Sequence, residues 1–254
     1  MYPRPSGFVT LTTDFGVADP YAGVMKGAVA RASAKPQVVD LSHDVPPQDI
    51  AAGAFVLWSA IGRFPAGSVH CGVVDPGVGS DRRILAACAR GDYWLVPDNG
   101  LLGAVLTSDT AAEVRAVDLE RLGVQREAVT FDGRDVFAPV AAMLSSGRYG
   151  FSALGPRVED GDCTDHVFAG GDRVVHVDHY GNLVTNVSAE RGSGRGVRLA
   201  GVEVAPQRTY ADVEDGALLA YVGAFGLLEV AARGDSAAKR LGIGRGAAVT
   251  LHPA

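Results

Sequence analysis

Cysteine is scarce in this chain, and no Cys-x-x-Cys pair occurs. The 254 residues include three cysteines, Cys71, Cys88 and Cys163, which are odd in number and widely spaced. A disulfide framework uses an even set of cysteines, and a zinc–thiolate site uses closely spaced pairs. We therefore expect neither, and we interpret the three as small apolar residues of a protein in a reducing compartment.

Basic charge and long apolar runs are scarce as well. Lys and Arg number 23 against 29 Asp and Glu, so the formal net charge is −6. Nucleic-acid-binding proteins usually carry a basic face, which argues against such a partner. No stretch approaches the roughly 20 apolar residues that cross a bilayer, and the N-terminal residues lack the pattern of a signal peptide. We expect a cytoplasmic protein that binds no membrane.

Several common catalytic motifs are missing. There is no Gly-x-x-x-x-Gly-Lys-[Ser/Thr] phosphate loop and no Gly-x-Ser-x-Gly elbow. Asp14, His43, Asp44 and Asp75 could form an oxygen-rich site for Mg²⁺ or Mn²⁺, but no local ligand spacing supports one. We expect no metal and no cofactor.

The first part of the chain alternates strand and helix patterns. Strands are expected at residues 7–12, 37–41, 69–74, 84–90 and 93–96, and helices at 21–33, 49–63, 101–106 and 135–144. This alternation is typical of an α/β sheet with parallel strands and helices on both faces. It predicts an N-terminal α/β domain over residues 1–160.

The pattern changes after a polar, turn-rich segment at residues 155–165. Beyond it, strands are expected at 173–177, 183–187, 197–199, 218–222, 227–231 and 247–251, and one short helix at 236–241. Domain boundaries commonly fall in such segments. We expect a smaller, mostly β, barrel-like domain over residues 165–254.

Polar motifs follow the first three expected strands, where ligands bind in open α/β sheets. They lie at residues 13–16, 40–44 and 74–79, and a fourth at 131–135 opens a later helix. Each has a simpler explanation. Asp14 could form an Asx turn, Asp75 could end its strand, Arg82 could be solvated, and Asp135 could favour a helix N-terminus. We expect His43 and Asp44 to order a loop.

A second group of polar and aromatic residues lies in the C-terminal half. Asp178, Tyr180 and Asn182 crowd a tight turn between two expected strands, and Tyr210 lies at another strand end. Two aromatic faces can hold a flat purine, although core packing is the default for a single tyrosine.

The order of these motifs resembles a known family. The motifs are Thr-Asp-Phe-Gly, Ser-His-Asp-Val-Pro-Pro-Gln-Asp, Val-Val-Asp-Pro-Gly-Val-Gly, Pro-Asp-Asn-Gly-Leu-Leu, Phe-x-Gly-Arg-Asp-Val-Phe-Ala-Pro and Asp-His-Tyr-Gly-Asn-Leu-Val-Thr-Asn. Over residues 8–251 the chain resembles the S-adenosyl-L-methionine (SAM) hydroxide adenosyltransferases, the hydrolytic relatives of the SAM-dependent fluorinase and chlorinase. The resemblance implies hydrolysis of SAM to adenosine and L-methionine. It also implies a homotrimer that binds SAM at its subunit interfaces.

The resemblance also assigns roles to individual residues. Asp14 matches an aspartate that binds both ribose hydroxyls, and Asp19 and Asp178 match carboxylates that face the methionine amino group. The residues that match an adenine or ribose contact are Tyr180, Tyr210, Asn182, Thr130 and Phe131. Asp75 and Arg82 match two members of an Asp–Arg–His set that activates water.

Two positions depart from the family pattern. Asp132 stands where the family has its histidine, and Ala224 stands where many relatives have a serine that holds the methionine carboxylate. Asp132 could complete the water site with Asp75 and Arg82, leaving an anionic excess that raises the pKa of one carboxyl. Alternatively, Asp132 could cap the following helix. The alternatives to hydrolysis are a SAM- or adenosine-binding protein with little turnover and, less favoured, a SAM-dependent halogenase.

Overall fold

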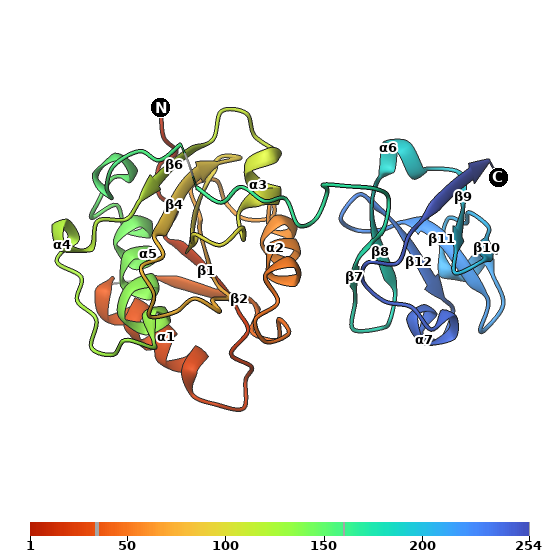
Figure 1. The fold of residues 1–254 in the computed structure, drawn as a ribbon, viewed down its shortest axis with the longest axis horizontal. Helices are drawn as coiled ribbons and strands as arrows, with labels where there is room; N and C mark the ends of the chain where they lie inside the picture. Colours follow the sequence, from red (N-terminus) through yellow and green to blue (C-terminus); the bar gives the residue numbers. More distant parts are fainter. Residues whose placement is uncertain (34–35, 160, 254) are drawn as a thin grey trace. The chain divides into compact units, whose positions relative to one another are not determined.

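The computed structural model describes residues 1–33, 36–159 and 161–253. The chain forms two compact units, Met1–His166 and Val167–Ala254, which we describe separately (Figure 1). Among the described residues, no helix is both long and apolar enough to cross a membrane.

The first unit is built on a six-stranded sheet in the order β2-β1-β3-β5-β4-β6. Its strands are β1 (Phe8–Thr13), β2 (Gln37–Ser42), β3 (Val69–Val73), β4 (Ile84–Ala89), β5 (Asp92–Pro97) and β6 (Glu113–Ala116). β1 pairs in parallel with both β2 and β3, and β3 pairs in parallel with β5. The carboxyl ends of these strands therefore share one edge of the sheet.

The expectation of parallel strands is wrong for β4, and β6 was not predicted. β4 pairs antiparallel with both β5 and β6. Only Arg90 and Gly91 separate β4 from β5, and both have positive φ, at 55° and 80°. A two-residue connection of this kind joins antiparallel neighbours, because parallel neighbours need a long crossover.

Helices cover both faces of this sheet, as predicted. Its helical segments are α1 (Tyr21–Ala32), α2 (Ile50–Ser59), α3 (Gly103–Thr107), α4 (Leu119–Leu122), the π-helical turn η1 (Gly133–Phe137), α5 (Ala138–Ser145) and the 3₁₀ turn η2 (Phe151–Ala153). One apolar core includes Met25 of α1 and Leu144 of α5, and a separate core includes Leu57 of α2 and Val105 of α3. The sheet is thus buried on both sides.

The helix expected at residues 135–144 begins instead with a wider turn. The backbone N–H of Ala138 donates to the carbonyl of Gly133, five residues back, and Pro139 follows in the first turn of α5. Because proline has no backbone N–H, Pro139 cannot donate the hydrogen bond to the carbonyl four residues before it that a regular α-helix would need. Single π-helical turns are frequent at functional sites, and this one directly follows Asp132.

The second unit is mostly β, as predicted. Its elements are β7 (Val174–Val177), β8 (Leu183–Ser188), α6 (Ala189–Gly192), β9 (Arg195–Leu199), β10 (Val202–Val204), the 3₁₀ turn η3 (Tyr210–Asp212), β11 (Leu218–Val222), β12 (Leu227–Ala232), α7 (Ala237–Leu241) and β13 (Thr250–Pro253). They form a four-stranded sheet, β11-β12-β8-β7, and a three-stranded sheet, β10-β9-β13. The last strand starts three residues later than expected, and α6 and β10 were not predicted.

Candidate active site

A small polar cavity lies at the carboxyl edge of the first sheet. Its volume is about 60 Å³, room for a few water molecules. β1 ends just before Asp14, β3 ends just before Val74 and Asp75, and the segment leading into η1 supplies a third wall. The residues that line the cavity are Asp14, Phe15, Val73, Asp75, Val78, Thr130, Phe131, Asp132 and Gly133. The structure thus brings together five of the predicted site residues, namely Asp14, Asp75, Thr130, Phe131 and Asp132.

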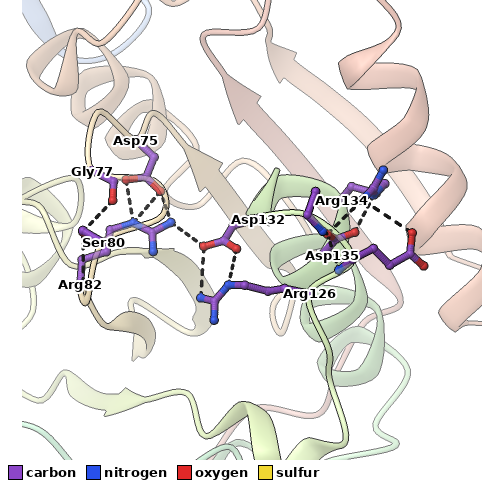
Figure 2. A network of polar contacts seen from close by, with 10 residues as sticks. Asp75, Gly77, Ser80, Arg82, Arg126, Asp132, Arg134 and Asp135 are labelled. Atoms are coloured by element: carbon purple, nitrogen blue, oxygen red, sulfur yellow. Dashed lines mark hydrogen bonds and ion pairs between the residues drawn. The ribbon is translucent and has the colours of Figure 1, made fainter. Parts of the chain in front are cut away.

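Arg82 joins the two carboxylates of this cavity. Its Nε lies 2.7 and 2.6 Å from the two oxygens of Asp75, and its Nη2 contacts Asp75 Oδ2. The same Nη2 donates to Asp132 Oδ2 at 2.7 Å (Figure 2). The exposed fractions of the Asp75, Arg82 and Asp132 side chains are 4%, 8% and 1%. Arg82 is therefore not the solvated charge that its sequence context allowed, but the shared partner of two buried carboxylates.

The loop between β3 and β4 delivers Arg82 to Asp75. Ser80 Oγ donates to the Gly77 carbonyl at 2.7 Å and accepts the backbone N–H of Arg82 at 3.3 Å (Figure 2). Gly79 has φ of 83°, a conformation that glycine adopts without strain. These local contacts orient the guanidinium from within its own loop.

A second arginine, which the sequence motifs did not single out, completes the array. Arg126 Nε donates to Asp132 Oδ1 at 2.6 Å, and its Nη2 lies 3.3 Å from Oδ2. Burial acts to raise the pKa of Asp132, but the hydrogen bonds from Arg126 and Arg82 outweigh it and hold that pKa below the usual value. Burial likewise acts to lower the pKa of Arg82, and its bonds to Asp75 and Asp132 raise it overall.

Two expectations about Asp132 are wrong. It does not cap the following helix, because within the described chain its side chain makes no hydrogen bond to that first turn and both oxygens bind arginines. The Asp75–Arg82–Asp132 set also lacks the anionic excess that the sequence led us to expect. Arg126 balances the charge that Asp132 adds, so the pKa of Asp132 is lowered and not raised.

Asn99, from the Pro-Asp-Asn-Gly motif, holds the end of the strand that carries Asp75. Its Nδ2 donates to the carbonyl of Val74 at 2.9 Å, and its Oδ1 accepts the N–H of Leu101 at 3.3 Å. The motif was visible in the sequence, but nothing local tied it to Asp75. This contact between separate loops makes Asn99 a positioning residue.

We expect Asn99→Ala to lower the kcat of the hydrolysis that the sequence motifs imply about tenfold with little change in KM, because small displacements of a reacting group are costly. Steady-state assays check this. Asn186→Ala is the matched control, since Asn186 also bonds one backbone N–H and one carbonyl, at Arg173 and Gly171 of the second unit. An unchanged kcat in Asn99→Ala would rule out the positioning role.

The Asp14 loop is held by contacts from the loop that follows the neighbouring strand, β2. The backbone N–H of Gln48 donates to Asp14 Oδ2 at 2.7 Å, and Gln48 has a strained φ of 64°. His43 Nδ1 lies 2.8 Å from Thr13 Oγ1, and the His43 carbonyl accepts the N–H of Gly16 at 2.7 Å. His43 orders the loop, as expected from the sequence, and Asp14 is fixed from outside its own turn.

Thr130 and Phe131 lie on a segment that Asp135 anchors. Asp135 Oδ2 accepts the N–H groups of Glu127 and Ala128 at 2.9 and 2.8 Å, and Arg134 binds the same carboxylate. Asp135 is thus an anchor for the preceding loop as well as a first-turn carboxylate. Asp19, by contrast, lies in an exposed stretch between β1 and α1 and does not line the cavity.

The second unit carries an open cavity of about 470 Å³. The residues that line it are Tyr180, Asn182, Tyr210, Ala232, Gly234 and Asp235. The structure therefore brings together the two tyrosines and the asparagine that the resemblance assigned to the adenine.

Asp178 holds two of the residues that line this cavity. Its Oδ1 accepts the N–H groups of Tyr180 and Asn182 at 2.9 and 2.8 Å, and its Oδ2 accepts Asn182 Nδ2 at 2.8 Å. The carboxylate orders the turn that carries two predicted contact residues, a task that the sequence motifs did not indicate.

Tyr210 is held by a chain of hydrogen bonds. The hydroxyls of Tyr210 and Tyr221 lie 2.8 Å apart, and Tyr221 donates to Glu229 Oε2 at 2.7 Å. Because Tyr221 donates to Glu229, Tyr210 is the donor to Tyr221. Burial, together with the charge of Asp178, raises the pKa of Glu229, although the bond from Tyr221 opposes that shift.

Both halves of the chain match models of one family. The SAM hydroxide adenosyltransferase N-terminal domain matches residues 9–155, and the C-terminal domain of the same name matches residues 172–250. The chain belongs to the SAM hydroxide adenosyltransferase family. The resemblance drawn from the sequence motifs is thereby confirmed.

Three relatives illustrate the range of this family and its neighbours. The chain is 38% identical to an (R)-S-adenosyl-L-methionine hydrolase of Thermus thermophilus, over 98% of this chain and 99% of the relative. It is 26% identical to a fluorinase of Nocardia brasiliensis, over 91% of each chain. A crystal structure of an uncharacterized conserved protein from Thermotoga maritima matches with a TM-score of 0.88 and 28% identity, covering 96% of this chain and 99% of that one.

Among the residues that the structure describes, no group of three or more His, Cys, Asp or Glu side chains is arranged to hold a metal ion. The four residues considered from sequence do not gather, because His43 binds Thr13 and Asp44 is exposed, while Asp14 and Asp75 line the cavity. In this member of the SAM hydroxide adenosyltransferase family, Asp75 and Asp132 at the cavity pair with arginines, and Asp14 accepts a backbone N–H.

Proposed function

We propose that this protein hydrolyses SAM to adenosine and L-methionine by attack of water at ribose C5′. The observation that carries the proposal is the buried Asp75–Arg82–Asp132 array at a cavity of water-molecule size, next to Asp14. The 38% identity to a named SAM hydrolase over nearly the whole chain supports it. SAM is the substrate, and the mechanism requires no metal or cofactor.

The chemistry needs positioning more than acid catalysis. The sulfonium of SAM is an activated leaving group, so methionine departs without protonation. Water must be oriented in line with the C5′–sulfur bond and lose a proton as it attacks. Asp75 accepts a hydrogen bond from that water and takes up its proton as the new C5′–O bond forms and the C5′–sulfur bond breaks, and Arg82 holds Asp75 and stabilises developing hydroxide.

Arg82 also has capacity to bind this water. Its Nη1 is buried and has no hydrogen-bond partner within the described chain. Buried donors are nearly always satisfied, and ordered water is the usual partner where protein groups are lacking. Asp132, which binds the same guanidinium group as Asp75, would then help to orient this water.

The charge of the array favours a neutral nucleophile. Asp75 and Asp132 balance Arg82 and Arg126, so no net positive charge remains to attract a halide. Each carboxylate about 4 Å from a halide would cost about 4 kcal/mol at an effective dielectric near 20. The arginines offset this cost only in part, because both carboxylates line the cavity and Arg126 stands behind Asp132.

We assign the other predicted site residues to the ribose, the adenine and the methionine end of SAM. Asp14 accepts the two ribose hydroxyls, and Thr130 and Phe131 line the ribose and the reaction centre. Tyr180 and Tyr210 flank the adenine, and Asn182 contacts its edge. Asp19 and Asp178 face the methionine amino group.

We also propose a homotrimer in which each SAM contacts two protomers. The family resemblance implies this assembly, and three side chains at or near the predicted contact residues are strongly exposed in the single chain: Val17 (74%), Val129 (71%) and Tyr180 (75%). Analytical ultracentrifugation tests the proposal, and a mass of one chain would contradict it.

The decisive assay incubates the purified protein with SAM in H₂¹⁸O and follows products by chromatography and mass spectrometry. We expect equal amounts of adenosine and methionine, with the label in the adenosine 5′-hydroxyl. SAM binding without turnover would support the binding-protein alternative. Halogenated nucleoside formed in chloride or fluoride would support the halogenase.

Replacing Tyr180 or Tyr210 by alanine should weaken SAM and adenosine equally. Each stacked ring contributes about 0.5–1.5 kcal/mol beyond the area it buries, or roughly two- to tenfold in Kd. Isothermal titration calorimetry measures both ligands. Tyr221→Phe keeps the rings and removes the hydroxyl that binds Tyr210, so it should have a smaller effect. Unchanged affinities in both alanine variants would contradict the adenine assignment.

A further inference from the structure

The position that departs from the family pattern is the one that Arg126 contacts. Asp132 binds Arg82 through Oδ2 at 2.7 Å and Arg126 through Oδ1 at 2.6 Å, so it lies between two guanidinium groups (Figure 2). Its side chain is 1% exposed, whereas that of Arg126 is 38% exposed. Arg126 thus reaches from solvent to a buried carboxylate.

A carboxylate and an imidazole differ in charge. Where the family has a histidine that can be neutral, Asp132 adds one negative charge to a buried site that already holds Asp75 and Arg82. An uncompensated buried charge is strongly destabilising, or is removed by protonation. A protonated carboxyl here would lose one of its acceptor oxygens. Arg126 supplies the missing positive charge from the opposite side of Asp132.

The backbone beside Arg126 is anchored within the chain itself. The next two N–H groups, of Glu127 and Ala128, donate to the buried carboxylate of Asp135. Arg134 holds that carboxylate through Nε and Nη2 at 2.5 and 3.0 Å (Figure 2). Arg126 is therefore delivered to Asp132 by a fixed segment, unlike a mobile surface arginine.

We propose that Arg126 is a positioning residue for water attack, which keeps Asp132 ionised and oriented so that the Arg126–Asp132 pair takes the place of the family imidazole. This inference rests on the proposed SAM hydrolysis. Arg126 acts through Asp132 and touches neither SAM nor the water.

If Arg126 has this role, removing it should shift the dependence of activity on pH. The charged groups around Asp132 are Arg126 and Arg82 in contact, and Asp75 and Asp14 on the same cavity. Both arginines lower the pKa of Asp132. Activity that needs ionised Asp132 is lost as the pH falls through that pKa, so removing Arg126 raises the pKa and moves the acidic limb to higher pH.

The test compares Arg126→Gln and Arg126→Lys in two backgrounds, the parent chain and Asp132→His. In the parent chain we expect Arg126→Gln to lower kcat about ten- to a hundredfold, to leave KM nearly unchanged and to move the acidic limb upward. Arg126→Lys should restore part of the loss, because it keeps the charge. In the Asp132→His background, Arg126→Gln should change kcat less than about twofold, since Arg126 then has lost the buried carboxylate with which it pairs.

Arg191→Gln is the matched control. Arg191 makes a two-point contact with Asp172 on the surface of the second unit, at 2.8 Å for both bonds. The Arg191→Gln substitution should leave kcat and the pH profile unchanged. Equal kcat in Arg126→Gln and the parent would overturn the inference, and so would an equal loss in both backgrounds, which would mark a merely structural role. A parent protein that binds SAM but releases no adenosine would overturn the proposed function itself.

Discussion

Asp75→Asn is expected to lower the kcat of SAM hydrolysis by about 10²- to 10⁴-fold, the range typical of a lost general base. The amide keeps the size of the carboxylate but offers one acceptor oxygen in place of two. Its NH₂ group would also oppose the N–H donors of Arg82, which contact both oxygens of Asp75. Because Asp75 is proposed to contact the water and not the nucleoside, KM for SAM should change only a few-fold.

Steady-state kinetics and thermal unfolding together measure this effect. Asp81→Asn is the control, since Asp81 lies in the same loop, is exposed and does not line the cavity. It should behave as the parent. An Asp75→Asn variant that folds normally and retains full kcat would show that water is activated elsewhere.

Asp14→Ala should abolish measurable binding of both SAM and adenosine. The carboxylate would accept two hydroxyls of the ribose, and hydrogen bonds to a charged group are worth about 1.5–3 kcal/mol each. Losing both corresponds to roughly a hundredfold to ten-thousandfold in Kd. The variant also leaves the N–H of Gln48 without its acceptor, in a backbone conformation already strained at φ of 64°.

Calorimetric titration with adenosine isolates the ribose contact, because adenosine lacks the methionine end. Asp44→Ala serves as the control, since Asp44 lies two residues after the end of the neighbouring strand but is exposed and does not line the cavity. Unchanged adenosine affinity in Asp14→Ala would exclude Asp14 from the ribose site.

Predictions of individual strands were accurate where the signal is local. β-Branched and apolar runs mark β1, β3 and β11 within a residue or so of their observed bounds. β6 was not predicted, because Glu113–Ala116 has only four residues, too few for its alternation of polar and apolar side chains to stand out. The expectation of a parallel β4 followed from the general alternation of helices and strands along this half of the chain. It gave too little weight to the short gap between β4 and β5, where Arg90 and Gly91 form the turn of a hairpin.

In the candidate site, too, residues with a local sequence signal could be predicted and residues without one could not. Asp75 lies in the Val-Val-Asp-Pro-Gly-Val-Gly motif and Arg82 three residues beyond it, and the family resemblance singled out both before their contact was visible. Arg126 precedes Asp132 by six residues in a polar segment, where an arginine is ordinarily solvated. No local pattern separated it from the other exposed arginines, and only the folded segment shows its contact with Asp132.

The sequence by itself determined the order of motifs, the family, the two-part organisation and the position of most strands, because these depend on neighbouring residues along the chain. The tertiary structure alone decided the charge balance at the cavity. Arg82 and Asp132 are 50 residues apart, and their contact depends on the adjacency of β1 and β3 and on a segment anchored by Asp135. Whether a buried carboxylate is ionised depends on which cations lie within a few ångströms of it, and that distance is set by packing.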